Sequence, residues 1–286
     1  MSNTIGFGQA AVNNTIDYGQ GAIDNTINWG KSQTLSPSGE TNITGTGATP
    51  PFSNLNSFSF DGIDDYFLVP DTSGLSFGNG TTDSPFSISA WVNMTDATNF
   101  RIVNKYDSNF EYLFSTGGAD TIVFLLYDNS TGGKIGRLYS TSLTSFQGSW
   151  IHLAATYSGN GSSTGLKIYL NGLRVDNTNN NSGSYTAMEN TTAPLEIGKV
   201  TTTNANGLID ETAIFTTELS QSDITAIYNN GEPQSLDAYS PFVWFRMGDN
   251  ATWNGATWTM TSVGTDTRIA RSIFMVEANR STDVPT

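Results

Sequence analysis

Residues 86–92 read FSISAWV, a run in which apolar and polar side chains alternate. Alternation with period two places Phe86 and Ile88 on the same face of a β-strand. Phe58 and Phe60 show the same spacing in an earlier segment. Both segments are therefore predicted to be strands that face inward between two packed sheets, which makes the fold class all-β with a sandwich architecture.

Further short strands are expected along the middle of the chain, with tight turns between them. The predicted strands span residues 57–60, 66–69, 86–93, 122–127, 150–157 and 166–170. Asn171-Gly172 suits a two-residue hairpin turn, because both residues tolerate positive φ. One helical turn is predicted after Ser220, which can cap its N-terminus, with Ile224 and Ile227 as its apolar stripe.

The composition agrees with short strands and polar turns. Hydrophobic residues make up 37% and charged residues 13% of the 286-residue chain. The formal net charge of −14 argues against nucleic acid and against an anionic membrane surface as partners, because both bind clustered Lys and Arg. No run approaches the roughly 18 apolar residues of a membrane helix. The absence of cysteine excludes disulfides, thiol nucleophiles and Cys-liganded zinc.

The N-terminus contains tandem copies of an eleven-residue unit. Residues 3–13 read NTIGFGQAAVN, residues 14–24 read NTIDYGQGAID, and a third copy begins at Asn25 and breaks off after Ser32. A unit this short cannot bury its own apolar side chains, so it must stack on neighbouring copies or dock on another chain. The sequence therefore predicts an attachment or assembly segment. The residues expected to make its contacts are Ile5, Phe7, Ile16, Tyr18, Ile27 and Trp29.

Four segments are expected in chain order. Residues 1–33 are the repeats, and residues 34–54 are a linker rich in Ser, Thr, Gly and Pro. Residues 55–235 are the sandwich domain. Residues 236–286 hold a closing strand, in an apolar run that begins at Pro241, and a C-terminal extension for which the sequence predicts no fold.

Six motifs in the middle of the chain stand in the order and spacing of one known family. They read FDGIDDY at residues 60–66, FSISAWV at 86–92, WIHLAATY at 150–157, LKIYLNG at 166–172, PLEIG at 194–198 and GLIDE at 207–211. Residues 55–235 thus resemble the laminin-G-like, concanavalin A-like lectin/glucanase jelly roll. This resemblance implies a sandwich of two sheets.

The two ends of the chain carry a second resemblance. The repeats are similar to short units at the N-termini of tailed-phage structural proteins, and WFRMGD at residues 244–249 is similar to sequences that follow such domains in phage proteins. The resemblance implies a virion fibre, appendage or capsid decoration protein that is made in the host cytoplasm. The start, MSNTIG, lacks the basic and apolar regions of a secretory signal. Other virion proteins are the expected partners, and a homotrimer is the expected oligomer.

Adhesion to cell-surface glycans is the function that the lectin-like resemblance implies. A sugar site needs an aromatic platform with nearby Asn, Asp or Arg side chains. The candidate ligand-binding residues in the middle loops are Tyr106, Asp107, Asn109, Tyr127 and Asp128, with ordinary surface as the alternative. Two other functions stay open: a structural capsid decoration without a glycan site, and a bacterial surface lectin or glycanase.

Calcium is the expected cofactor, in a structural role. Asp61 and Asp64 lie beside Gly62 in a predicted bend, and Asp210 lies near the other end of the domain. Hard oxygen ligands in an irregular bend suit Ca²⁺, and the resemblance implies a structural calcium in this region. Pairing of the first and last strands would unite Asp61 or Asp64 with Asp210. The alternative for the same aspartates is Asx-turn hydrogen bonding.

Catalysis is not expected. Asp210 and Glu211 are adjacent, and neighbours in a regular strand point to opposite faces, so they are not predicted to form a paired active site. His152 is the one histidine of the chain and lies in a predicted strand, which favours a structural role. Trp91 and Trp150 are expected to fill the core between the sheets.

Overall fold

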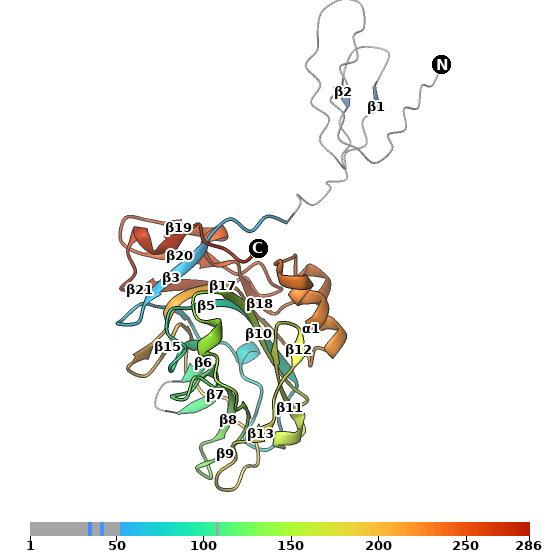
Figure 1. The fold of residues 1–286 in the computed structure, drawn as a ribbon. Helices are drawn as coiled ribbons and strands as arrows, with labels where there is room; N and C mark the ends of the chain where they lie inside the picture. Colours follow the sequence, from blue (N-terminus) through green and yellow to red (C-terminus); the bar gives the residue numbers. More distant parts are fainter. Residues whose placement is uncertain (1–33, 36–40, 43–51, 107–108) are drawn as a thin grey trace, which may run out of the picture. The chain divides into compact units, whose positions relative to one another are not determined.

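The computed structural model describes residues 34–35, 41–42, 52–106 and 109–286. The chain forms two compact units, Met1–Pro51 and Phe52–Thr286. In the first unit, β1 (Thr34–Leu35) pairs antiparallel with β2 (Thr41–Asn42). The second unit, described from here on, is a two-sheet sandwich (Figure 1). The all-β sandwich prediction is confirmed.

One sheet of the sandwich has eight strands. Its order is β12 (Leu173–Arg174), β11 (Leu166–Leu170), β10 (Trp150–Tyr157), β5 (Phe86–Met94), β17 (Asn206–Phe215), β3 (Ser57–Asp61) and β22 (Arg280–Ser281), and β18 (Val243–Phe245) also pairs with β17. Neighbouring strands are antiparallel. Asn171 and Gly172, with φ of 49° and 77°, form the turn between β11 and β12, as predicted.

The other sheet has ten strands, also antiparallel. Its order is β13 (Thr178–Asn179), β9 (Gly133–Tyr139), β8 (Ile122–Asp128), β7 (Phe110–Thr116), β6 (Arg101–Tyr106), β14 (Leu195–Ile197), β4 (Tyr66–Val69), β21 (Ile269–Ile273), β20 (Trp258–Thr261) and β19 (Ala251–Trp253). A separate hairpin joins β15 (Lys199–Val200) to β16 (Thr203–Asn204). Every strand predicted from the period-two pattern is present, with ends shifted by one residue at most.

The main core lies between the two sheets. Phe86, Ile88 and Ala90 of β5 point into it together with Phe58 and Phe60 of β3, as the alternation predicts. The ring of Phe86 stacks on that of Phe77 with centroids 4.2 Å apart. Burying a phenylalanine side chain of this kind contributes about 1.5–3 kcal/mol.

A second apolar cluster covers the outer face of the eight-stranded sheet, beneath α1 (Gln221–Tyr228). Ser220 caps the helix in a reciprocal pair of hydrogen bonds with Asp223, and Ile224 and Ile227 are buried, as predicted. Figure 1 shows α1 beside this sheet. Because Asp223 is the third residue of the helix, its carboxylate can reach back to the Ser220 N–H.

The two tryptophans expected between the sheets lie elsewhere. Trp91 is buried, but on the outer face, where its ring lies 5.9 Å from Tyr228 and 5.2 Å from His152. Trp150 is half-buried, and its Nε1 donates to Asp283 Oδ1 at 2.8 Å. Trp91 follows Ala90, so the same alternation that buries Ala90 in the core turns Trp91 outward.

Residues 236–286 are built into both sheets. β18 pairs with β17, which fits the predicted closing strand, and β22 pairs with β3. β19, β20 and β21 extend the ten-stranded sheet beyond β4. The C-terminal residues therefore complete the sandwich.

Short 3₁₀ turns connect several strands: η1 (Ser73–Leu75), η2 (Thr144–Phe146), η3 (Ser163–Gly165), η4 (Asn229–Gly231), η5 (Asp237–Tyr239), η6 (Met247–Asn250) and η7 (Glu277–Asn279). Within the described part of the chain, no helix has the length and apolar character needed to cross a membrane.

Candidate functional site

Three aromatic side chains stack on the outer face of the ten-stranded sheet. The ring of Phe110 lies between those of Tyr106 and Tyr127, with centroid separations of 3.7 Å and 4.6 Å. All three side chains are half-buried. Phe110 and Tyr127 pack against an apolar floor made by Leu113, Val123, Leu125 and Val200. We call this group of three stacked rings, with its floor, the sheet-face platform.

The topology explains why these rings meet. Tyr106 and Phe110 are cross-strand partners at the closed end of the β6–β7 hairpin, and β8, which carries Tyr127, is the next strand. Two of the predicted ligand-binding residues, Tyr106 and Tyr127, are thus brought together. Phe110 was not predicted. The signal for it was an aromatic residue four positions after Tyr106, on the far side of a short turn.

The other predicted ligand-binding residues differ in position. Asn109 is exposed next to Phe110, at the edge of the platform. Asp107 lies outside the described residues. Asp128 is buried, and its carboxylate accepts hydrogen bonds from Ser130 Oγ at 2.7 Å and from the Thr186 N–H at 2.7 Å. The carboxylate of Asp128 therefore holds the loop after β8.

The surroundings of Tyr127 and Asp128 determine the ionisation of these two side chains. Burial raises the pKa of Tyr127 to about 12, although the nearby charge of Arg101 acts to lower it. The hydroxyl of Tyr127 therefore stays protonated and can donate a hydrogen bond. Burial also raises the pKa of Asp128, but its hydrogen bonds from Ser130, Thr186 and Thr131 outweigh burial and lower that pKa to about 2.

A second candidate site lies in the turn between β3 and β4. One carboxylate oxygen from each of Asp61, Asp64 and Asp65 falls within 4.8 Å of the others. A cavity of about 320 Å³ adjoins them, and its other lining residues are Ser59, Phe274, Val276, Ala278 and Asn279. Burial, and then repulsion from Asp61, raises the pKa of Asp65. This repulsion is what a bound cation would relieve.

The three carboxylates fit a hard divalent cation by their chemistry. Asp61 Oδ1 also accepts hydrogen bonds from the Ile63 N–H at 2.8 Å and the Asp64 N–H at 3.3 Å, so the Asx-turn alternative is present as well. Asp210 is not part of this group. Asp61 pairs with Asn206, and Asp210 lies four residues further along β17, about 13 Å away at ~3.3 Å per residue.

A β-bulge in β17 changes the expected directions of Asp210 and Glu211. Asp210 pairs with Trp91 and Ala213 with Ser89, so β17 has one extra residue here, and Glu211 takes a φ of 46°. The prediction that the two carboxylates face opposite sides of the strand is wrong. Both point to the outer face of the eight-stranded sheet, because the bulge breaks the alternation.

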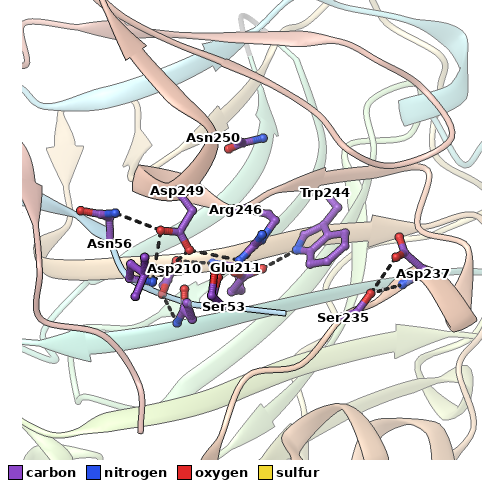
Figure 2. Close-up of polar contacts among 12 residues, drawn as sticks. Ser53, Asn56, Asp210, Glu211, Ser235, Asp237, Trp244, Arg246, Asp249 and Asn250 are labelled. Carbon is purple, nitrogen blue, oxygen red and sulfur yellow. Dashed lines mark hydrogen bonds and ion pairs between the residues drawn. The ribbon is translucent and has the colours of Figure 1, made fainter. Parts of the chain in front are cut away.

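Figure 2 shows the buried carboxylate cluster that results, formed by Asp210, Glu211 and Asp249 around Arg246. Arg246 Nε lies 3.2 Å from Glu211 Oε1, and its Nη2 lies 3.1 Å from Asp249 Oδ2. Trp244 Nε1 donates to Glu211 Oε2. One guanidinium thus pairs with two of the carboxylates, Glu211 and Asp249, and Asp210 instead accepts hydrogen bonds from Asn54 and from the Glu211 N–H.

The segment at residues 52–56 covers this cluster. Asn54 Nδ2 donates to Asp210 Oδ2 at 2.8 Å, and the Leu55 N–H donates to Asp249 at 3.1 Å. Burial, and then repulsion from Glu211, raises the pKa of Asp210 well above its usual range. Burial raises the pKa of Glu211 to about 7, even though Arg246 favours its charged form. Asp210 is 0% exposed and Glu211 is 3% exposed.

The remaining candidates have structural positions. His152 is fully buried, its Nε2 lies 2.8 Å from Ser89 Oγ, and burial lowers its pKa to about 3. It is therefore neutral and serves packing, as predicted. The six attachment residues predicted in the repeats, from Ile5 to Trp29, lie outside the described residues.

Comparisons with known proteins agree with this architecture. A family model described as the Concanavalin A-like lectin/glucanases superfamily, of laminin G type, matches residues 61–225, more than half of the chain. No curated protein is a significant match to the sequence.

Many solved structures share the fold at low sequence identity. A candidate carbohydrate binding protein from Bacteroides ovatus ATCC 8483 is 15% identical, with a TM-score of 0.53, over 86% of this chain and 68% of that one. Domain 4 of an extracellular arabinanase from Geobacillus stearothermophilus, solved with arabinotriose, is 20% identical, with a TM-score of 0.43, over 65% and 84%. Domains LG4-5 of the mouse laminin alpha1 chain are 13% identical, with a TM-score of 0.43, over 64% and 43%.

The family match spans the six motifs of the sequence, from the β3–β4 turn to α1, and the two antiparallel sheets are those of its fold. The chain belongs to the Concanavalin A-like lectin/glucanases superfamily through its laminin G-like domain.

Proposed function

We propose that the domain is a glycan-binding module and that the sheet-face platform is its binding surface. The observation that carries this proposal is the stack of Tyr106, Phe110 and Tyr127 on the outer face of the ten-stranded sheet, where all three rings are partly exposed. An aromatic surface packs against the C–H face of a sugar ring, and nearby polar groups bond its hydroxyls. Here the Tyr127 hydroxyl and the exposed Asn109 amide supply such groups. Membership of a lectin-containing superfamily supports the same function.

We propose further that the module is not an enzyme. A glycosidase needs two carboxyl groups that reach opposite sides of a glycosidic bond. Asp210 and Glu211 are adjacent and on one face, but both are buried beneath residues 52–56 and occupied by hydrogen bonds. Their position favours a role in holding that segment.

Replacing Tyr127 with alanine is expected to weaken glycan binding at least tenfold. The substitution removes one ring of the stack and its hydroxyl, and a tenfold loss corresponds to about 1.4 kcal/mol. The measurement is a glycan array with the full chain, followed by titration calorimetry on the glycans that bind. Tyr239→Ala is the matched control, since Tyr239 is half-buried on the other sheet. Equal affinity of the wild type and Tyr127→Ala would contradict the proposed surface.

We propose further that this glycan-binding module is displayed on a virion as part of a fibre, appendage or capsid decoration. The N-terminal repeats and their resemblance to phage structural proteins support it. A homotrimer joined through the repeats would present three platforms, and multivalent display raises weak single-site affinity by about 10²–10⁴. A structural decoration without a glycan site is the second candidate, and it predicts no binding on the array.

We also propose that Asp61, Asp64 and Asp65 hold a structural Ca²⁺. Saturating Ca²⁺ is then expected to raise the melting temperature of the full chain by several degrees, since a ligand at ~100 times its Kd stabilises by about 2.7 kcal/mol. Asp64→Asn is expected to abolish that shift, because it removes a ligand without removing the hydrogen bonds of Asp61. Asp96→Asn, at an exposed turn, is the control. Calorimetry in which Asp64→Asn responds like the wild type would exclude this site.

A further inference from the structure

Three basic side chains on the outer face of the ten-stranded sheet have no carboxylate partner among the residues that the structure describes. Seven basic residues among those that the structure describes lie within 4.0 Å of a carboxylate: Lys105, Arg137, Lys167, Arg174, Lys199, Arg246 and Arg268. No such ion pair is found in this part of the chain for Arg101, Lys134, Arg271 or Arg280. Three of these four lie on that one outer face.

The strand alternation places them there. Arg101 precedes Ile102, Lys134 precedes Ile135, and Arg271 follows Ala270, and those three apolar neighbours all point into the core. Successive residues of a regular strand point to opposite faces, so Lys134 and Arg271 point outward. Arg101 stands at a register shift of β6, and its hydrogen bond to Ser115 Oγ places it on the same face, because Ser115 pairs with Val123 of the platform floor. In a chain with a formal charge of −14, unpaired positive charge gathered on one face is unexpected from composition.

Two of these cations flank the sheet-face platform. Lys134 is the direct cross-strand partner of Tyr127. The guanidinium of Arg101 donates to Ser115 Oγ at 3.2 Å, and Ser115 pairs with Val123 of the platform floor. Arg101 is also close enough to Tyr127 for its charge to act on the pKa of the tyrosine hydroxyl. Tyr127 is thus the ring around which the two positive charges are placed.

The surroundings of Arg101 disfavour its charged form. Its Nε is buried and has no hydrogen-bond acceptor among the described residues, and burial lowers its pKa. A partly desolvated cation without a counter-ion gains more from an anionic ligand than a hydrated surface cation does. Two carboxylates on neighbouring segments of the described chain are already engaged: Glu196 lies 3.9 Å from Lys199, and Glu189 accepts the N–H groups of Asn129 and Ser130.

We infer that the sheet-face platform selects anionic glycans, with a sugar ring against Tyr127 and its carboxylate or sulfate group facing Arg101 and Lys134. This inference rests on the proposed function, because it names the substrate class of the same surface. Guanidinium groups recognise carboxylate and sulfate oxygens alike, so the shared chemistry is an oxyanion on a hexose.

The test compares each anionic oligosaccharide with its neutral counterpart, using the full chain. One arm uses sulfated galactan oligosaccharides and the same material after desulfation. The other uses oligouronates and their methyl esters. The wild type is expected to bind at least one anionic form about tenfold more tightly than its neutral counterpart, and raising the salt concentration is expected to reduce that ratio. The arm with the larger ratio identifies the oxyanion.

Variants that remove single charges test which residues cause the preference for anionic glycans. Arg101→Gln and Lys134→Gln are each expected to lower the anionic-to-neutral affinity ratio severalfold, whereas Tyr127→Ala weakens both forms. Arg280→Gln is the matched control, since Arg280 has no carboxylate partner among the described residues and lies on the other sheet. Melting curves of each variant verify that it is folded. An unchanged ratio in Arg101→Gln and Lys134→Gln, or an equal loss in Arg280→Gln, overturns the inference.

The outcomes also separate the inference from the function on which it rests. Wild-type protein that binds neutral and anionic forms equally, with both affinities lost in Tyr127→Ala, overturns the selectivity and leaves the platform as a glycan site. Wild-type protein that binds none of the oligosaccharides overturns both.

Discussion

Replacement of Lys105 with methionine is expected to lower the free energy of unfolding by about 3–5 kcal/mol. The Lys105 side chain is 0% exposed, and its Nζ lies 2.8 Å from Asp71 Oδ1 and 2.7 Å from Glu111 Oε1. Glu111 is also fully buried, and it accepts further hydrogen bonds from Thr191 and Ser76. Removing the ammonium therefore leaves an unbalanced buried carboxylate. Urea denaturation of the two proteins measures the difference.

Two comparisons test the reason for that loss. Lys167→Met removes a partly exposed lysine that pairs with Glu218 at 2.6 Å, and it is expected to cost less than about 1 kcal/mol. The double variant Lys105→Met/Glu111→Gln removes both buried charges and is expected to recover part of the stability. If Lys105→Met costs no more than Lys167→Met, the buried ion pair is not a major contributor to the fold.

The protein is expected to lose stability as pH rises through about 7, and Glu211→Gln is expected to remove much of that loss. Burial raises the folded-state pKa of Glu211 from 4.5 to about 7, so the folded state holds a proton that the unfolded state has released. The resulting stability is fully present below the unfolded pKa and is lost as pH rises through the folded pKa. A shift of this size corresponds to a loss on the order of 3 kcal/mol.

Burial and the charges of Asp210 and Asp249 disfavour the charged form of Glu211. Arg246 and the hydrogen bond from Trp244 favour that form, but burial outweighs them and the pKa is raised. Glutamine keeps an oxygen that can accept from Trp244 but carries no charge. Urea denaturation from pH 5 to pH 8 is the measurement, with Glu277→Gln as an exposed control. Parallel pH curves for wild type and Glu211→Gln would show that Glu211 titrates normally.

The sequence was sufficient where one local rule determines the structure. Period-two alternation located Phe86 and Ile88 in the core, because β5 pairs with β10 in an unbroken register and successive side chains of a regular strand point to opposite faces. Ser220 predicted the start of α1, because a capping side chain lies next to the N–H groups it satisfies. Tyr106 and Tyr127 were candidates because an aromatic ring beside Asn or Asp suits a sugar site, although both belong to strands, β6 and β8, and not to loops.

The features that the sequence did not predict depend on contacts between segments that are distant in the chain. Asp210 and Glu211 point to the same face, and not to opposite faces, because a bulge adds one residue to β17. No residue type in GLIDE indicates that bulge. Trp91 was expected between the sheets, although alternation from Ala90 turns it outward; what depends on a distant segment is its ring contact with Tyr228 of α1 on that outer face. The burial of Lys105 requires Asp71 and Glu111 to meet it from two other segments. Such pairings are long-range, so a single sequence does not reveal them.

The decisive measurement is where a bound glycan sits on the protein. Backbone amide shifts of the full chain, recorded by NMR during titration with the tightest-binding oligosaccharide, would map the surface that it contacts. We expect the largest shifts around Tyr106, Phe110 and Tyr127, with Arg101 and Lys134 also affected if the glycan is anionic. Shifts confined to the β3–β4 turn and Phe274, with the platform unchanged, would contradict it.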